Sequence, residues 1–126
     1  MNDEIIKLSW HEMDQLHRLA ASKVEQANFC PDIVIGILRC GMVSAVHLAY
    51  ILGIRKVGAI FAQTTPSDEV LVSKDIPPEI RIDFPREEIF GKRVLLVDTV
   101  MASGTTVSMS LEELAACNPS TIHTLI

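Results

Sequence analysis

Residues 94–107 read VLLVDTVMASGTTV, an apolar run that ends at one carboxylate, Asp98, and continues into a turn rich in hydroxyl groups. Four consecutive apolar residues without alternation are typical of a strand buried on both faces of a parallel sheet. A helical pattern over residues 106–117 follows, and Asn118-Pro119 ends it. The stretch therefore predicts a buried strand that leads through a small turn into a helix.

The same succession occurs earlier in the chain. The run IVIGIL at residues 33–38 predicts a second buried strand, and MVSAVHLAYIL, just after Gly41, predicts a helix that Gly53 ends. Further strands are predicted at residues 57–62 and 121–126. This order of strands and helices predicts an α/β fold, with a doubly wound, mainly parallel sheet flanked by helices.

A further helix is expected near the N-terminus. Ser9 can cap it, with Glu12 as the capping-box partner three residues later. Apolar residues then recur at helical spacing, which predicts that one face of this helix packs onto the rest of the protein. These residues are Met13, Leu16, Leu19, Ala20 and Val24.

Residues 64–92 are of a different kind. They contain four prolines, many charges and two short alternating runs, EVLVS and EIRID. This composition predicts a projecting hairpin or flexible loop rather than an element of the core. Its cations, which include Lys74, Arg81 and Arg86, are interpreted as solvated charges, although a cation there could reach a bound anion.

Composition limits the class of protein. The 126 residues, 48% of them hydrophobic, predict a single domain over residues 1–126. Sixteen acidic against 11 basic residues give a net charge of -5, which argues against nucleic-acid or anionic-membrane partners. Three scattered cysteines, no apolar signal core and no membrane-spanning run predict a cytoplasmic protein. His11, His17 and His123 are too dispersed to argue for a metal site, and His47 is interpreted as a satisfied core histidine.

The turn after Asp98 predicts an anion site. Ligands of open α/β sheets bind at the carboxyl ends of the strands, and a helix N-terminus favours an anion. Gly104 allows close backbone approach, and an acid beside a phosphate suits a ligand with hydroxyl groups, such as ribose 5-phosphate. The turn is neither a Walker loop nor a dinucleotide fingerprint, because no Lys follows Gly104 and G-x-G-x-x-G is absent. An ordinary helix-capping turn is the alternative explanation.

Two motifs resemble those of type I phosphoribosyltransferases. The strand, acid and turn of residues 94–107 are similar to the family's motif for phosphoribosyl pyrophosphate (PRPP). PDIVIGILRCGMVSA, residues 31–45, is similar to the family's first strand and pyrophosphate loop. Residues 64–92 fall where the family has its flexible active-site loop. The resemblance covers nearly the whole chain.

The resemblance implies a role for each matched residue. Asp98 would be the catalytic residue, with Thr99 beside it near the ribose, and Asp98 would also hold Mg²⁺, directly or through water. The pyrophosphate loop would comprise Arg39, Cys40 and Gly41. The 5-phosphate loop would comprise Ala102, Ser103, Gly104, Thr105 and Thr106. The implied reaction transfers ribose 5-phosphate from PRPP to a nucleobase, and a homodimer is expected.

The sequence also departs from the family pattern. Thr99 stands where a second acid is usual, and Ala102 where hypoxanthine–guanine enzymes usually have Asp. ILRCG is similar to the first loop of uracil enzymes, whereas the Trp-bearing first helix is similar to that of small purine enzymes. The identity of the nucleobase therefore stays open, with a purine favoured. The family's C-terminal hood over the base is expected to be short or missing after residue 126. Residues 1–9 and 64–85 or a partner subunit would then supply it, or base recognition has been lost, which leaves a PRPP- or nucleotide-binding regulatory protein as the alternative.

Overall fold

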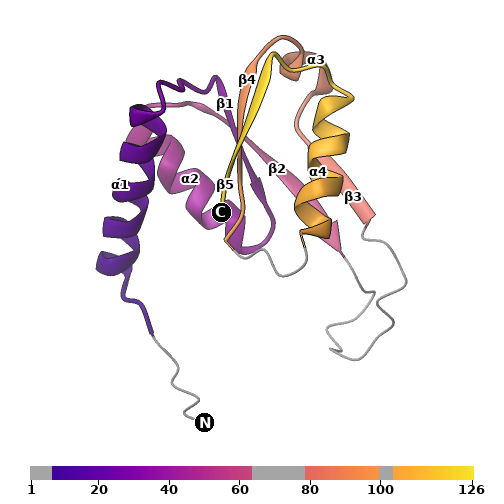
Figure 1. Ribbon diagram of the computed structural model, residues 1–126. Helices are drawn as coiled ribbons and strands as arrows, with labels where there is room; N and C mark the ends of the chain where they lie inside the picture. The colour runs from indigo at the N-terminus through magenta and orange to yellow at the C-terminus, as the bar shows by residue number, and fades with distance from the viewer. Residues whose placement is uncertain (1–6, 64–78, 100–103) are drawn as a thin grey trace.

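The computed structural model describes residues 7–63, 79–99 and 104–126 (Figure 1). The elements in chain order are α1 (Trp10–Gln26), β1 (Ile33–Ile37), α2 (Cys40–Leu52), β2 (Lys56–Gln63), β3 (Glu79–Asp83), α3 (Arg86–Ile89), β4 (Arg93–Val97), α4 (Thr105–Ala115) and β5 (Thr121–Leu125). Each predicted strand and helix is present, with bounds that differ by a few residues. No helix among the described residues is long and apolar enough to cross a membrane.

The strands form one five-stranded sheet in the order β3-β2-β1-β4-β5. The pairs β1–β2, β1–β4 and β4–β5 are parallel, and β2–β3 is antiparallel. The predicted doubly wound, mainly parallel sheet is therefore confirmed. Because β1 and β4 lie side by side in the centre, their carboxyl ends, which lie within the two motifs, are neighbours.

The prediction of a projecting loop at residues 64–92 is wrong for its second half. Residues 79–83 form β3, which pairs with β2, and Ile89 of α3 is fully buried in the core. Strand β3 has the alternating burial expected of an edge strand with one packed face. The alternation of apolar and polar residues in EIRID was visible in the sequence. No local pattern, however, indicates that this segment pairs with β2 across the long connection of residues 64–78. Residues 64–78 lie outside the described residues.

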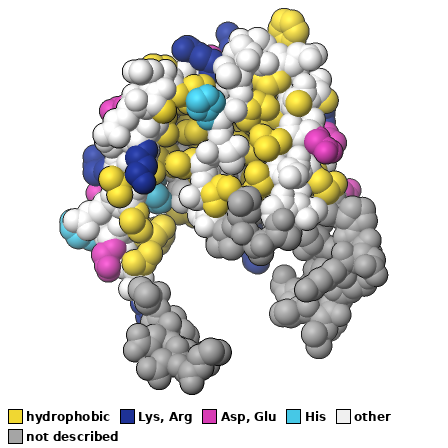
Figure 2. Space-filling view, in the orientation of Figure 1, with side chains coloured by type: hydrophobic (Ala, Val, Ile, Leu, Met, Phe, Trp, Pro, Cys, Tyr) yellow, Lys and Arg dark blue, Asp and Glu magenta, His cyan; other side chains and the backbone are white. Residues whose placement is uncertain are grey.

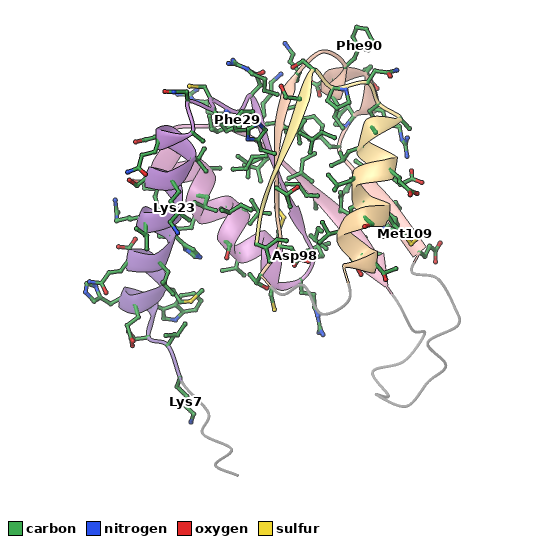
Figure 3. The ribbon with its side chains drawn as sticks, in the orientation of Figure 1. Lys7, Lys23, Phe29, Phe90, Asp98 and Met109 are labelled. Carbon is green, nitrogen blue, oxygen red and sulfur yellow. The ribbon has the colours of Figure 1, made fainter. Side chains whose placement is uncertain are left out.

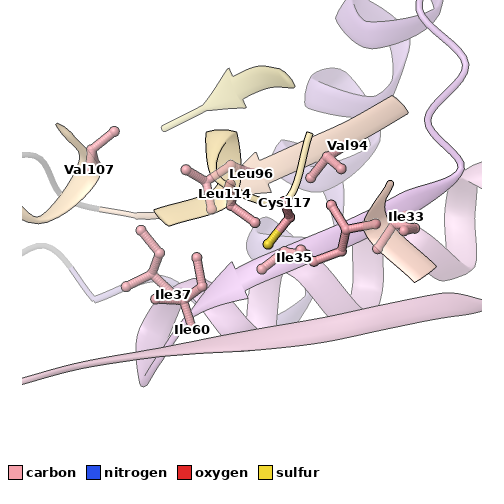
Figure 4. Close-up of a cluster of buried hydrophobic side chains, with 10 residues drawn as sticks. Ile33, Ile35, Ile37, Ile60, Val94, Leu96, Val107, Leu114 and Cys117 are labelled. Atoms are coloured by element: carbon pink, nitrogen blue, oxygen red, sulfur yellow. The ribbon is translucent and has the colours of Figure 1, made fainter. Parts of the chain in front are cut away.

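The two faces of the sheet carry separate hydrophobic clusters because side chains alternate along each strand. Ile33, Ile35 and Ile37 of β1 face α4, in a cluster with Leu96 and Leu114 (Figure 4). The opposite face packs on α1 and α2, with Val34, Leu95, Val97, Ala45 and Leu48 among its members. β1 and β4 are thus covered on both faces, as their uninterrupted apolar runs predicted (Figure 1).

Local signals fix the ends of the two helices on that face. Ser9 and Glu12 form the predicted capping box, with both hydrogen bonds at 3.1 Å. Gly53 ends α2 in the left-handed conformation, at φ 75°, as predicted. The predicted packed face of α1 is partly wrong: Leu16 and Leu19 are exposed, and His17 is buried instead.

An ion pair ties the amino ends of β1 and β4 together. Arg93 donates to both carboxylate oxygens of Asp32 at 3.1 Å, and its backbone N–H donates to the same group at 2.9 Å. These hydrogen bonds from Arg93 hold the pKa of Asp32 below its ordinary value. The pair therefore supports the register of the two motif-bearing strands at neutral pH, and this support weakens as acid protonates Asp32.

Ser110 on α4 offers a test of the core packing. Its side chain is fully buried, and its Oγ has no hydrogen-bond partner among the described residues. Ser110→Ala removes an unsatisfied hydroxyl at nearly constant volume, so we expect unfolding to cost about 1 kcal/mol more than in the wild type. Urea denaturation measures the change, and Ser108→Ala, at an exposed position of the same helix, is the control. A loss of stability in the Ser110 variant alone would contradict the prediction.

Candidate functional site

Asp98 lies at the carboxyl end of β4, at the lower end of the sheet in Figure 3. Its backbone N–H donates to the carbonyl of Leu125 at 3.0 Å, so β5 fixes the backbone at this point. Its Oδ1 accepts from the N–H of Thr99 at 2.8 Å, which holds the carboxylate in one orientation. Asp98 is half-buried and Thr99 is exposed, so the carboxylate is anchored at a place that a ligand can reach.

The first turn of α2 approaches Asp98 closely through Gly41. A Cβ placed on Gly41 would lie 2.7 Å from the carbonyl oxygen of Val97, 3.1 Å from the Asp98 Cα and 3.3 Å from its Oδ1. No larger residue fits at position 41 without moving one of the two segments. The two motifs singled out in the sequence therefore meet at one edge of the sheet.

Arg39 and Cys40 mark the start of α2. Arg39 is the residue before the helix, and its side chain is exposed. The peptide bond between Leu38 and Arg39 is cis. Cys40, a free thiol, is the first helical residue and is also exposed. Both residues thus lie beside Gly41 in the chain, on the edge of the sheet that carries Asp98.

The N-terminus of α4 lies at the same end of the sheet (Figure 1). Gly104 precedes the helix in the left-handed conformation, at φ 80°, and has no side chain with which to cap it. Thr105 and Thr106 form the start of the first turn. Ala102 and Ser103, the other residues of the predicted 5-phosphate loop, lie outside the described residues. The described part is a helix N-terminus entered through glycine, which is suited to an anion.

A cavity of about 320 Å³ adjoins Asp98 on the side of α1. Figure 2 shows hydrophobic side chains gathered on this face, between α1 and the sheet. Sequence reasoning missed the cavity, although Leu16 and Leu19, exposed on α1, were visible as apolar residues of the helix. Its lining residues are Met13, Leu16, His17, Leu19, Ala20, Lys23, Ser44, Leu48, Val97, Asp98, Thr99, Leu125 and Ile126.

Among residues 7–63, 79–99 and 104–126, no group of three or more His, Cys, Asp or Glu side chains could hold a metal ion. Asp98 is the carboxylate that the motif itself supplies. Mg²⁺ is usually bound through one or two carboxylates together with substrate phosphates and waters. A single Asp98 fits a metal that arrives with a phosphorylated ligand better than a resident ion.

Comparison with known families gives one match, to the phosphoribosyl transferase domain, over residues 8–126. The chain belongs to this family. Its domain is that of the phosphoribosyltransferases, enzymes of the class that transfers pentosyl groups. The resemblance carried by residues 31–45 and 94–107 is confirmed. A comparison with curated proteins found no match.

Several solved structures share the fold. A purine phosphoribosyltransferase from Pyrococcus horikoshii has 26% identity and a TM-score of 0.77, over 94% of this chain and 73% of its own. A Neisseria gonorrhoeae protein with bound ppGpp has 24% identity and a TM-score of 0.76, over 94% and 68%. A hypoxanthine phosphoribosyltransferase from Staphylococcus aureus has 15% identity and a TM-score of 0.71, over 99% and 70%.

Proposed function

We propose that this phosphoribosyltransferase transfers ribose 5-phosphate from PRPP to a nucleobase and releases pyrophosphate, with a purine favoured over uracil. The observation that supports this most strongly is the close approach of Gly41 to Asp98. This approach brings the two sequence motifs together at the edge of the sheet where α4 also begins. A substrate with phosphate groups at both ends of a ribose needs such an arrangement.

Each part of the site has a role in this reaction. The bond from the ribose C1 to a pyrophosphate oxygen breaks, a bond from C1 to a ring nitrogen of the base forms, and that nitrogen loses its proton. The sugar becomes positively charged in between, and the Asp98 carboxylate stabilises this charge because it is already oriented by the Thr99 N–H. Residues 39–41 hold the leaving pyrophosphate, and residues 102–106 hold the 5-phosphate.

Mg²⁺ would neutralise pyrophosphate charge when the substrate brings it to Asp98. We expect the enzyme to act in the cytoplasm and to form a homodimer. Sedimentation of the purified protein tests the homodimer. The chain's own groups bind and orient PRPP before the base attacks.

A second candidate is a regulatory protein that binds PRPP or another phosphorylated nucleotide without catalysis. Two observations favour it: Thr99 replaces a second acid, and the similar Neisseria gonorrhoeae protein has ppGpp bound. A protein of this kind would bind PRPP at the same edge of the sheet but would turn over none of it.

Pyrophosphate release from PRPP and Mg²⁺ separates the two candidates. Adenine, hypoxanthine, guanine, xanthine, uracil and orotate are offered separately, and binding of PRPP and of ppGpp is measured by calorimetry. Base-dependent release supports the enzyme and identifies its substrate. Binding without release by folded protein supports the regulatory alternative, and neither binding nor release would contradict both.

Gly104→Val tests the proposed 5-phosphate loop. A β-branched residue at φ 80° is strained, and its side chain blocks backbone approach to a phosphate. We expect the affinity for PRPP to fall about tenfold or more, the value of one lost charge-assisted hydrogen bond. Gly91→Val is the matched control, because Gly91 also has positive φ, 71°, but lies at the amino end of β4. Equal PRPP affinity in the two variants would place the phosphate elsewhere.

A further inference from the structure

Four side chains of α1 and α2 form a hydrogen-bonded chain that the proposed reaction does not use. Ser44 Oγ lies 3.0 Å from His17 Nε2, and His17 Nδ1 lies 2.8 Å from His47 Nδ1. His47 Nε2 lies 3.1 Å from Asp14 Oδ1. Ser44 and His17 are buried, whereas about a third of the His47 and Asp14 side chains is exposed, 32% and 33%. The chain leads from the surface to the wall of the cavity beside Asp98.

The hydrogen-bonding capacity of these groups fixes the tautomer of each ring. A hydrogen bond from Arg18 holds the pKa of Asp14 below its ordinary value, so Asp14 is an acceptor at neutral pH. His47 must then donate from Nε2, and its Nδ1 accepts when the ring is neutral. His17 therefore donates from Nδ1, and its Nε2 accepts from the Ser44 hydroxyl.

One added proton reverses part of this chain. The hydrogen on His17 Nδ1 passes to His47 Nδ1, the added proton is carried by His17 Nε2, and His17 stays neutral. His17 now donates to Ser44 Oγ, whose own hydrogen can reach the Cys40 carbonyl one helical turn earlier. A second proton would put N–H groups on both Nδ1 atoms, which face each other at 2.8 Å.

The surrounding charges favour His47 as the site of the positive charge. His47 faces Asp14, whose other charged neighbours on α1 are Arg18 and His11. Burial, followed by the proximity of His47, lowers the pKa of His17. Across the cavity His17 is accompanied by Lys23 of α1 and by Asp98 after β4. The other titratable residues of α2 are Cys40 and Tyr50, both exposed.

We propose that His17 and His47 bind a single proton as one unit, and that this proton inverts the hydrogen bond between His17 and Ser44. The protein thereby has a pH-sensitive device in which uptake of one proton changes Ser44, in the cavity wall, from donor to acceptor toward His17. Histidine places such a change between about pH 5 and 8. The inference does not depend on the proposed reaction.

Two-bond ¹H–¹⁵N correlation spectra of the histidine-labelled wild type test the inversion. At about pH 8 we expect His17 to carry its hydrogen on Nδ1 and His47 on Nε2. On acidification His47 should become an imidazolium, while His17 stays neutral and changes to the Nε2–H form. A His17 that keeps one tautomer throughout, or that becomes charged first, would overturn the proposal.

Asp14→Asn provides a second test in the same spectra. The amide still accepts from His47 Nε2 but carries no charge, so we expect the proton affinity of the two-histidine unit to fall about tenfold, which moves the midpoint of the inversion by about one pH unit. Glu25→Gln, an exposed position on the same helix, is the matched control and should leave the midpoint unchanged. An equal midpoint in the Asp14 variant would show that the proton does not reside on His47.

Discussion

Asp98→Asn is expected to reduce base-dependent pyrophosphate release by about a hundredfold or more, the effect of removing one oriented electrostatic group in other enzymes. The amide keeps the shape of the side chain and still accepts from the Thr99 N–H, so the end of β4 should be undisturbed. What is lost is the negative charge beside the ribose. Because that charge acts on a positive sugar formed only during bond breaking, kcat should fall more than the affinity for PRPP.

Asp83→Asn is the matched control for this change. Asp83 is an exposed carboxylate on β3, paired with Ala59 in the amino-terminal half of β2 and therefore away from the edge that carries Asp98. Thermal unfolding of both variants shows whether the fold is retained. Full turnover in a folded Asp98 variant would remove this carboxylate from the mechanism.

The central strands could be predicted from the sequence because their pattern is unambiguous. IVIGI and VLLV have no polar residue, and only a strand covered on both faces buries every position of such a run. EIRID could not be placed in the same way. Its alternation describes one packed face, but the register of β3 with β2 is set by pairing across residues 64–78, which no local pattern records.

The position of the site was predictable, and its contacts were not. Asp98 and residues 39–41 each follow a buried parallel strand, so both were expected at the carboxyl edge of the sheet. That Gly41 touches Asp98 depends on β1 and β4 being adjacent, which the strand order decides. The contact between His17 and His47 was not predictable for a similar reason. His17 lies on the same face of α1 as Met13 and Ala21, but the packing of α1 on α2 decides that His47 is its partner.

Gly41→Ala is expected to have the second large effect. Its new Cβ would lie 2.7 Å from the Val97 carbonyl, which is backbone of the central strand β4 and cannot move at low cost. The start of α2 must shift instead. We expect the pyrophosphate loop to be displaced and the affinity for PRPP to fall more than tenfold, as small misplacements in a site commonly cost that much or more.

A fall in PRPP affinity could come from lost stability alone and not from displacement of the pyrophosphate loop. Gly53→Ala is the control that separates the two causes. Gly53 ends the same helix at φ 75°, so an alanine there is strained by about 1 kcal/mol, yet its Cβ would meet nothing within 4 Å. Titration of each variant with PRPP, beside its urea denaturation curve, gives both quantities. If the Gly41 and Gly53 variants lose stability but bind PRPP equally well, the contact between Gly41 and Asp98 serves packing and not the pyrophosphate loop. If only the Gly41 variant loses affinity, the two motifs act as one site because a missing side chain lets them touch.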